Sequence, residues 1–131
     1  MDPFFNDFRS YIGISLAAEL FHLCKGKQFE PMHDGDFVNF INLRPTLNQV
    51  KIKVGEKTRL SYFIYILSKE IVDPYCSDYW ESKMLEQCNI EKKHYEKHRC
   101  DIISKENKAN KNFRESLQKA ISDAVKFDSA L

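Results

Sequence analysis

The feature that most restricts the fold is the segment from residue 56 to residue 72, EKTRLSYFIYILSKEIV, in which apolar side chains recur at helical spacing. One helix face carries Leu60, Phe63, Ile64, Leu67 and Ile71. Tyr62 and Ile66 widen that face. The segment therefore predicts a strongly hydrophobic helix that ends at Asp73-Pro74. We expect Trp80 to join the same core, because a Trp and a continuous apolar helix must bury together.

Two further helices are predicted before this segment. The first has apolar residues in steps of three and four, at Phe5, Phe8, Ile12, Leu16, Leu20 and Leu23. Pro3 fits the start of this helix and Gly26 fits its end. After a loop over 27–35, Asp36 is expected to cap a short helix that stops before Pro45. That helix carries Phe37, Phe40 and Ile41.

Residues 50–54, VKIKV, alternate between apolar residues and lysines. Strict alternation is typical of a strand, so the pattern predicts a short strand or wing. Leu47, Val50 and Val54 also fit one face of a helix, and the segment is too short to decide between the two. Gly55 ends it in either case.

The C-terminal half predicts three more helical stretches. Ser77 or Asp78 can cap the first, whose inward residues are Trp80, Met84, Leu85 and Cys88. Asn89-Ile90 is a break, and a second helix runs from Glu91 to about Ser104. Residues 105–112, KENKANKN, are a loop or an exposed helical turn. The last helix has Phe113, Leu117, Ile121 and Val125 in steps of four.

These elements predict an all-α or mainly α protein of five to six helices. The 131 residues are about one domain's worth, and we find no internal domain boundary. The prediction is one domain over 1–131, with N-terminal helices in 1–45 and a helical core over 56–127. Only four Gly and four Pro weigh against sandwiches, barrels and Gly-rich phosphate loops.

The cysteines and the hydropathy pattern give an expected location. Cys24, Cys76, Cys88 and Cys100 include no CxxC pair, and the N-terminal sequence MDPFFNDFRS is not that of a secretory signal. Reduced thiols are therefore expected rather than disulfides. The longest apolar run, 62–67, has six residues, whereas a membrane span needs about 20. We expect a soluble cytoplasmic protein with no membrane contact.

Signals for catalysis are sparse. The sequence has no Walker loop, no GxSxG elbow, no HExxH and no DxDxDG. Cys100 is close to His98 and Arg99 in sequence, but neighbouring residues on a helix point in different directions. His94 and His98 share a helix face, yet a structural metal site normally has a second ligand pair. We therefore predict no enzyme, no catalytic residues, no cofactor and no metal site.

Residues 77–104 have the layout of a helix-turn-helix, whose second helix enters the major groove of DNA. A helix is followed by a tight break at Asn89-Ile90 and then by a basic helix. Asn89 suits the turn, because Asn tolerates a left-handed backbone better than most residues. An ordinary helical hairpin satisfies the same pattern.

The motif also predicts which side chains face inward and which face solvent. Ile90 and Tyr95 should be buried, facing Met84 and Cys88 of the preceding helix. The basic residues of the second helix are then the candidate contacts to double-stranded DNA: Lys92, Lys93, Lys97 and Arg99.

Charge distribution gives an independent indication. The whole chain carries a net charge of +1, so it has no field that would demand nucleic acid. Residues 91–119, however, contain nine Lys and Arg against five acids. Residues 51–59 add Lys51, Lys53, Lys57 and Arg59 against Glu56. Clustered positive charge is what phosphate binding requires, although a solvated helix face with mixed charges is the alternative.

Three stretches support a family resemblance: KTRLSYFIYIL (57–67), LEQCNIEKKHYEK (85–97) and NFRESLQKAI (112–121). Their matching residues are Ile64, Tyr65, Leu67, Asn89, Ile90, Tyr95, Phe113 and Leu117. Through them, residues 57–121 resemble the C-terminal region of RteC-type proteins, the regulators of excision carried by Bacteroides conjugative transposons. The resemblance implies an all-helical or winged DNA-binding regulator on a mobile element.

Two functions therefore stay open. The first is a DNA-binding helix-turn-helix regulator that acts on double-stranded DNA. The second is a non-catalytic helical interaction module, in which Phe4, Phe5, Phe8 and Tyr11 form a surface for a homodimer or another partner.

Overall fold

The computed structural model describes residues 10–105 and 107–130, and within these ranges the backbone forms seven helices and no strand. The first three are α1 (Ile14–Cys24), α2 (Asp34–Ile41) and α3 (Lys57–Ser68). They are followed by α4 (Pro74–Gln87), α5 (Lys92–His98), α6 (Asp101–Ser104) and α7 (Lys108–Ala130). The predicted all-α class is confirmed. No helix in the described ranges combines the length and the apolar character needed to cross a membrane.

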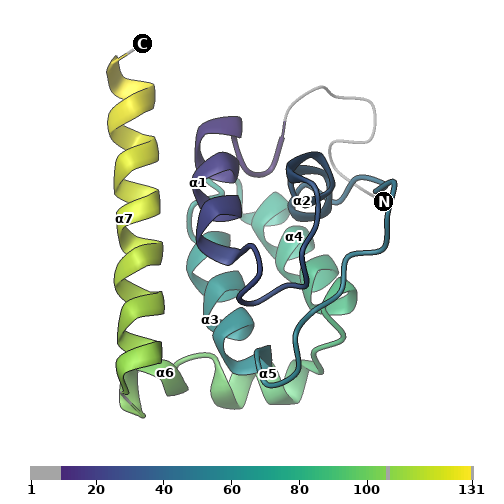
Figure 1. The fold of residues 1–131 in the computed structure, drawn as a ribbon, viewed down its shortest axis with the longest axis vertical. Coiled ribbons are helices and arrows are strands. Elements are labelled where there is room, and N and C mark those ends of the chain that lie inside the picture. Colours follow the sequence, from purple (N-terminus) through teal and green to yellow (C-terminus); the bar gives the residue numbers. More distant parts are fainter. Residues whose placement is uncertain (1–9, 106, 131) are drawn as a thin grey trace.

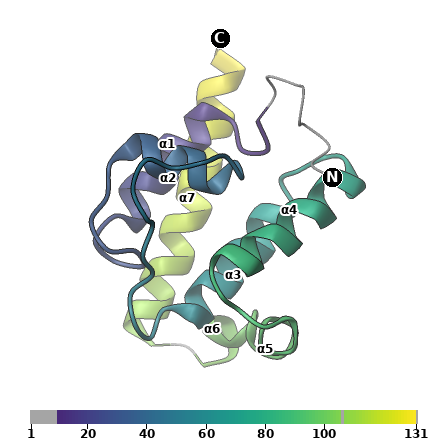
Figure 2. The same ribbon diagram turned by 90° about the vertical axis from the view of Figure 1, so that its right-hand side faces the viewer.

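The helices form two groups that meet at a common core. Helices α1, α2 and α7 lie on one side, α3 and α4 lie on the other, and α5 and α6 close one end of the molecule (Figure 2). Helix α3 contacts α4, α5, α6 and α7, which makes it the central helix of this arrangement. The long α7 rises from the end formed by α5 and α6 and packs along α1 (Figure 1).

The expected burial of α3 is confirmed. Its fully buried apolar residues are Leu60, Phe63, Ile64 and Leu67. Ser61 is also fully buried, and its hydroxyl donates to the carbonyl oxygen of Lys57 (2.8 Å). That bond satisfies a polar group that would otherwise be costly inside the core. Trp80 of α4 is buried as predicted, and its Nε1 donates to the carbonyl oxygen of Ile41 (2.7 Å).

The junction between α3 and α4 differs from the prediction. Helix α3 ends at Ser68, and Asp73 is the N-cap of α4 rather than the end of α3. The Asp73 carboxylate accepts hydrogen bonds from the backbone N–H groups of Tyr75 and Cys76. Pro74 fits the first helical position, where no N–H donor is needed. The expected caps Ser77 and Asp78 are therefore wrong, because both lie within the helix.

The N-terminal helices also begin elsewhere than expected. Helix α1 starts at Ile14, so the predicted helix does not extend through residues 11–13, while residues 1–9 lie outside the described ranges. The Ile12 N–H instead donates to Asn42 Oδ1 (2.8 Å), which ties this segment to the end of α2. The expected end near Gly26 is confirmed, since Gly26 follows α1 with φ of 69°.

Asp36 does not cap α2, because the helix begins two residues earlier, at Asp34. Its carboxylate faces the loop after the helix, where it accepts hydrogen bonds from the Leu47 N–H (2.9 Å) and the Asn48 side chain (3.1 Å). These bonds hold the pKa of Asp36 below its usual value. The residue therefore fixes a loop rather than a helix start.

The segment 50–54 forms neither a strand nor a helix. Its one ladder-like contact is an antiparallel bridge between Ile52 and Phe29. Two backbone hydrogen bonds flank this bridge, from Glu30 N to Lys51 O and from Lys53 N to Gln28 O. The alternation holds at Ile52, which packs on the core, but fails at Val54, which is fully exposed.

The last two predicted helices need correction as well. The stretch from Glu91 to Ser104 is divided into α5 and α6 by a turn at residues 99–100. In α7, Phe113 and Leu117 are buried as expected, but Val125 is 56% exposed. Residues in steps of four drift around a helix of about 3.6 residues per turn, so the row leaves the packed face. The face is continued instead by Ala120 and Ala124.

Replacing Trp80 by Ala should lower the free energy of unfolding by about 3–5 kcal/mol, because it leaves a large cavity and an unpaired Ile41 carbonyl. Urea denaturation followed by circular dichroism measures this change. The control is Tyr75→Ala on the same helix, where the side chain is 64% exposed and the effect should be small. Equal midpoints for the two variants would contradict the position of Trp80 in the core.

Candidate nucleic-acid interface

The turn between α4 and α5 has the conformation that the sequence predicts. Asn89 has φ of 54°, in the left-handed region, and Ile90 is buried. The Ile90 N–H donates to the carbonyl oxygen of Leu85 (2.9 Å), which closes the turn against the end of α4. In Figure 2, α5 is viewed nearly along its axis while α4 runs across the picture, so the two helices cross steeply.

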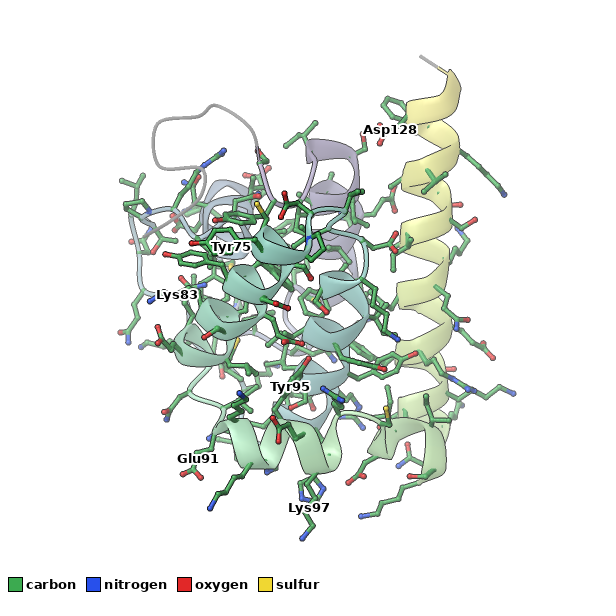
Figure 3. All side chains as sticks on the ribbon, turned by 180° about the vertical axis from the view of Figure 1, so that it is seen from behind. Tyr75, Lys83, Glu91, Tyr95, Lys97 and Asp128 are labelled. Atoms are coloured by element: carbon green, nitrogen blue, oxygen red, sulfur yellow. The ribbon has the colours of Figure 1, made fainter. Side chains whose placement is uncertain are left out.

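Tyr95 anchors α5 to the rest of the molecule. Its side chain is almost completely buried, and its hydroxyl donates to Glu81 Oε2 on α4 (2.5 Å). Burial and this hydrogen bond raise the pKa of Tyr95 above its usual value, so the phenol is neutral in the folded protein. Figure 3 shows Tyr95 directed toward the body of the molecule and Lys97 directed away from it.

Arg99 lies in a different environment from the three lysines with which it was grouped. Its guanidinium carbon is 4.6 Å from the ring centre of Tyr65 on α3 and 5.3 Å from that of Tyr95. The side chain is half-buried between these two rings. Contacts of this kind are attractive because a cation faces the negative surface of each ring. Arg99 thus helps to hold α5 on α3 rather than extending into solvent.

The three lysines of α5 are all exposed, but they are not equivalent. Lys92 is 4.0 Å from the carboxylate of Glu96, one turn further along the helix. Lys93 and Lys97 are also one turn apart, and neither has an ion pair or hydrogen bond with another described side chain. These two ammonium groups are the ones that α5 offers to a partner.

A groove of about 530 Å³ lies between α4 and α5 and has a mixed, mainly acidic lining. Its acidic residues are Asp78, Glu81, Glu86 and Glu96. Its basic residues are Lys92 and Arg99, both of which already face an acid or an aromatic ring. Carboxylates repel phosphate, so this side of α5 is unsuited to a nucleic-acid backbone.

The histidines of α5 hold the next helix in place. The rings of His94 and His98 are 4.6 Å apart between centres, and His98 Nδ1 is 2.6 Å from Asp101 Oδ2. This hydrogen bond holds the pKa of Asp101 below its usual value. Nowhere in the described ranges do three or more His, Cys, Asp or Glu residues gather as a metal site requires.

The four cysteines are free thiols that lie in different environments. Cys24, Cys76 and Cys88 are buried, and burial raises the pKa of the Cys88 thiol to about 12. A thiol with a raised pKa is a poor nucleophile near neutral pH, because little thiolate is present. Cys100 is exposed, but the nearby His98 ring is hydrogen-bonded to Asp101.

Arg59, one of the basic residues of the 51–59 cluster, is also engaged within the molecule. Its Nη1 is 2.6 Å from Glu56 Oε2, and its Nε donates to Asn110 Oδ1 on α7 (2.9 Å). Local spacing gives no sign of this contact with α7, because Asn110 is 51 residues away in the sequence. Local spacing likewise gives no sign of the contact between Arg99 and Tyr65, because Tyr65 lies on α3.

Comparison with known proteins finds no matching family model, no matching curated protein and no matching solved structure. The resemblance to RteC-type proteins therefore stays a prediction.

Substitution of Asn89 tests the turn. Asn89→Ala should lower the free energy of unfolding by about 1–2 kcal/mol, the cost of a left-handed backbone for an ordinary residue. Asn89→Gly should be at least as stable as the wild type, since Gly adopts this conformation without strain. Thermal or urea unfolding measures both.

Asn112, which is exposed within α7, is the matched control. There the order should reverse, with Ala more stable than Gly by about 1 kcal/mol because the site is helical. The same order of stability at both positions would contradict a left-handed Asn89.

Proposed function

We propose that this protein is a cytoplasmic helix-turn-helix regulator that binds double-stranded DNA through α5. The observation that carries the proposal is the pair Lys93 and Lys97, exposed and without an ion pair to another described side chain on a helix that Tyr95 ties to α4 and Arg99 ties to α3. A rigid helix with free cations on its outer face is what insertion into a major groove requires.

The packing around the turn supports this function. Helix α3 contacts both α4 and α5, so the three helices form one unit from which α5 is presented at the end of the molecule (Figure 1). In a helix-turn-helix, the second helix of the motif contacts base edges while the others position it. In the proposal α5 takes that role, and its seven residues are few enough for its outer face to meet one groove.

The chemistry of α5 favours binding that depends mainly on phosphates. Lys93 and Lys97 can contact phosphate oxygens or guanine O6 and N7. No Asn, Gln or free Arg lies on the outer face for bidentate contacts to bases. The proposal therefore predicts modest sequence specificity from α5 and a clear dependence on salt. It assigns no catalytic step.

The alternative is a helical interaction module that forms a homodimer. One of the aromatic residues proposed for that surface, Tyr11, is buried and stacks on Tyr79 of α4 (6.4 Å between ring centres). Phe4, Phe5 and Phe8 lie outside the described ranges. Because Tyr11 packs internally, it is not available to such a surface. Size-exclusion chromatography with light scattering gives the oligomeric state directly.

Fluorescence anisotropy with a labelled duplex at several salt concentrations tests the proposal. The double variant Lys93→Ala, Lys97→Ala should bind more weakly, and the salt slope should fall by about 0.9 per lost phosphate contact. The fold should be intact because both side chains are exposed. Circular dichroism and a melting curve check that point.

The matched control is Lys119→Ala, Lys126→Ala, which removes the same charge from exposed positions of α7. This variant should keep the wild-type affinity and salt slope. A wild-type protein without duplex affinity at low salt would exclude the proposed function. Equal losses in the two double variants would show that only net charge matters and that α5 is not the contact.

A further inference from the structure

A basic cleft lies beside the α4–α5 turn, separate from the acidic groove. It has a volume of about 670 Å³ and is open to solvent between the segment 49–58 and residues 87–89. The lining residues able to donate hydrogen bonds from their side chains include Lys51, Lys53, Lys57, Thr58 and Asn89. No carboxylate belongs to the lining. The charged side chains that line this cleft are therefore all lysines, whereas the groove between α4 and α5 is lined by acids and bases.

Backbone pairing explains why the lysines reach this cleft. The bridge between Ile52 and Phe29 directs Ile52 toward the core, so the side chains on either side of it turn the other way. Lys51 and Lys53 are those neighbours. Lys53 Nζ also donates to the carbonyl oxygen of Gly26 (2.7 Å), which fixes its position at the cleft.

The positive charge of the cleft is not neutralised by the acid that lies closest in sequence. Glu56 accepts hydrogen bonds on both carboxylate oxygens, from Gln28 Nε2 (2.9 Å) and from Arg59 Nη1 (2.6 Å). It is largely buried and does not line the cleft. Lys51 and Lys57 have no ion pair or hydrogen bond with another described side chain, so both ammonium groups are available to a ligand.

The cleft and α5 occupy the same end of the molecule. Figure 1 shows the chain before α3 descending to this end, where it enters α3 beside α5. The turn that leads into α5 forms one wall of the cleft through Asn89. A polyanion that reaches from α5 to the cleft would contact Lys93 and Lys97 together with Lys51 and Lys57.

We propose that this cleft binds a phosphate of the sugar–phosphate backbone of DNA, as a second contact beside α5. The inference rests on the proposed function, because it takes the same duplex as ligand. Phosphate oxygens accept hydrogen bonds from ammonium, hydroxyl and amide groups, all of which line the cleft. Contacts of this kind position a protein on DNA and carry no sequence information directly.

A first experiment tests the cleft without DNA. Inorganic tripolyphosphate is titrated into the ¹⁵N-labelled protein at low salt, and amide shifts are followed by NMR. Shifts should concentrate in residues 51–58 and 87–89, and they should disappear there in the variant Lys51→Ala, Lys57→Ala. The variant Lys51→Arg, Lys57→Arg should keep them, because it keeps the charge. Absence of shifts in these residues overturns the proposal.

A second experiment tests the duplex as the source of the phosphate. The double variant Lys51→Ala, Lys57→Ala should weaken duplex binding and lower its salt slope by about 0.9 per lost contact. Combined with Lys93→Ala, Lys97→Ala in one protein, it should weaken binding further than the α5 substitutions alone. Lys119→Ala, Lys126→Ala is again the control for net charge. The arginine variant should bind as the wild type does.

The outcomes separate the two proposals. If the cleft variant binds the duplex like the control while the α5 variant binds weakly, the cleft proposal is overturned and the proposed function stands. If the wild type binds tripolyphosphate in the cleft but no duplex, the proposed function fails. The cleft then serves a small phosphate compound, and its assignment to the DNA backbone is overturned as well.

Discussion

Burial of α3 is the constraint on which the other elements depend. Its apolar residues occupy most of its circumference, so α4, α5, α6 and α7 all pack against it. The polar groups that this burial encloses are satisfied within the helix, as with the Ser61 hydroxyl and the Lys57 carbonyl. The short α5 is attached to these helices by two side chains. Tyr95 is buried and bonds to Glu81 on α4, and Arg99 lies over the ring of Tyr65 on α3. Exposure of Lys93 and Lys97 follows from that attachment.

Local periodicity predicted most of the helices but not their ends, and it merged α5 and α6 into one helix. The hydrophobic helix α3, the burial of Trp80 and the left-handed Asn89 all follow from spacing and residue type. The predictions are wrong for segments whose structure depends on contacts with residues far away in the sequence. Residues 11–13 are not helical, and Ile12 is tied to Asn42, which lies 30 residues away. Within the described ranges, residues 50–54 form a single bridge, between Ile52 and Phe29, which lies 23 residues earlier in the sequence.

In the candidate interface too, the spacing along one helix could be predicted, whereas contacts with other helices could not. Spacing predicts that Lys93 and Lys97 face away from Tyr95, because each is two positions from it on a helix. The expectation that Lys92 does the same is wrong, because Lys92 is three positions from Tyr95 and lines the acidic groove with it. Spacing cannot predict that Arg99 stacks on Tyr65, because that residue lies on another helix. Charge counting likewise treats all basic residues alike. The fold divides them into those engaged by aromatic rings or acids and those left free.

A near-neutral protein can still present a charged surface if its acids and bases are separated in space. Here the acids Asp78, Glu81 and Glu86 line one groove beside the α4–α5 turn, and the lysines of the basic cleft line another that shares no residue with it. Asn89 lines the basic cleft, and its left-handed backbone leads the chain into α5. Its conformation therefore fixes the position of the two free lysines of α5 relative to those of the cleft. Two contacts joined by a rigid turn bind a rigid polyanion with less loss of conformational entropy than two contacts on flexible segments.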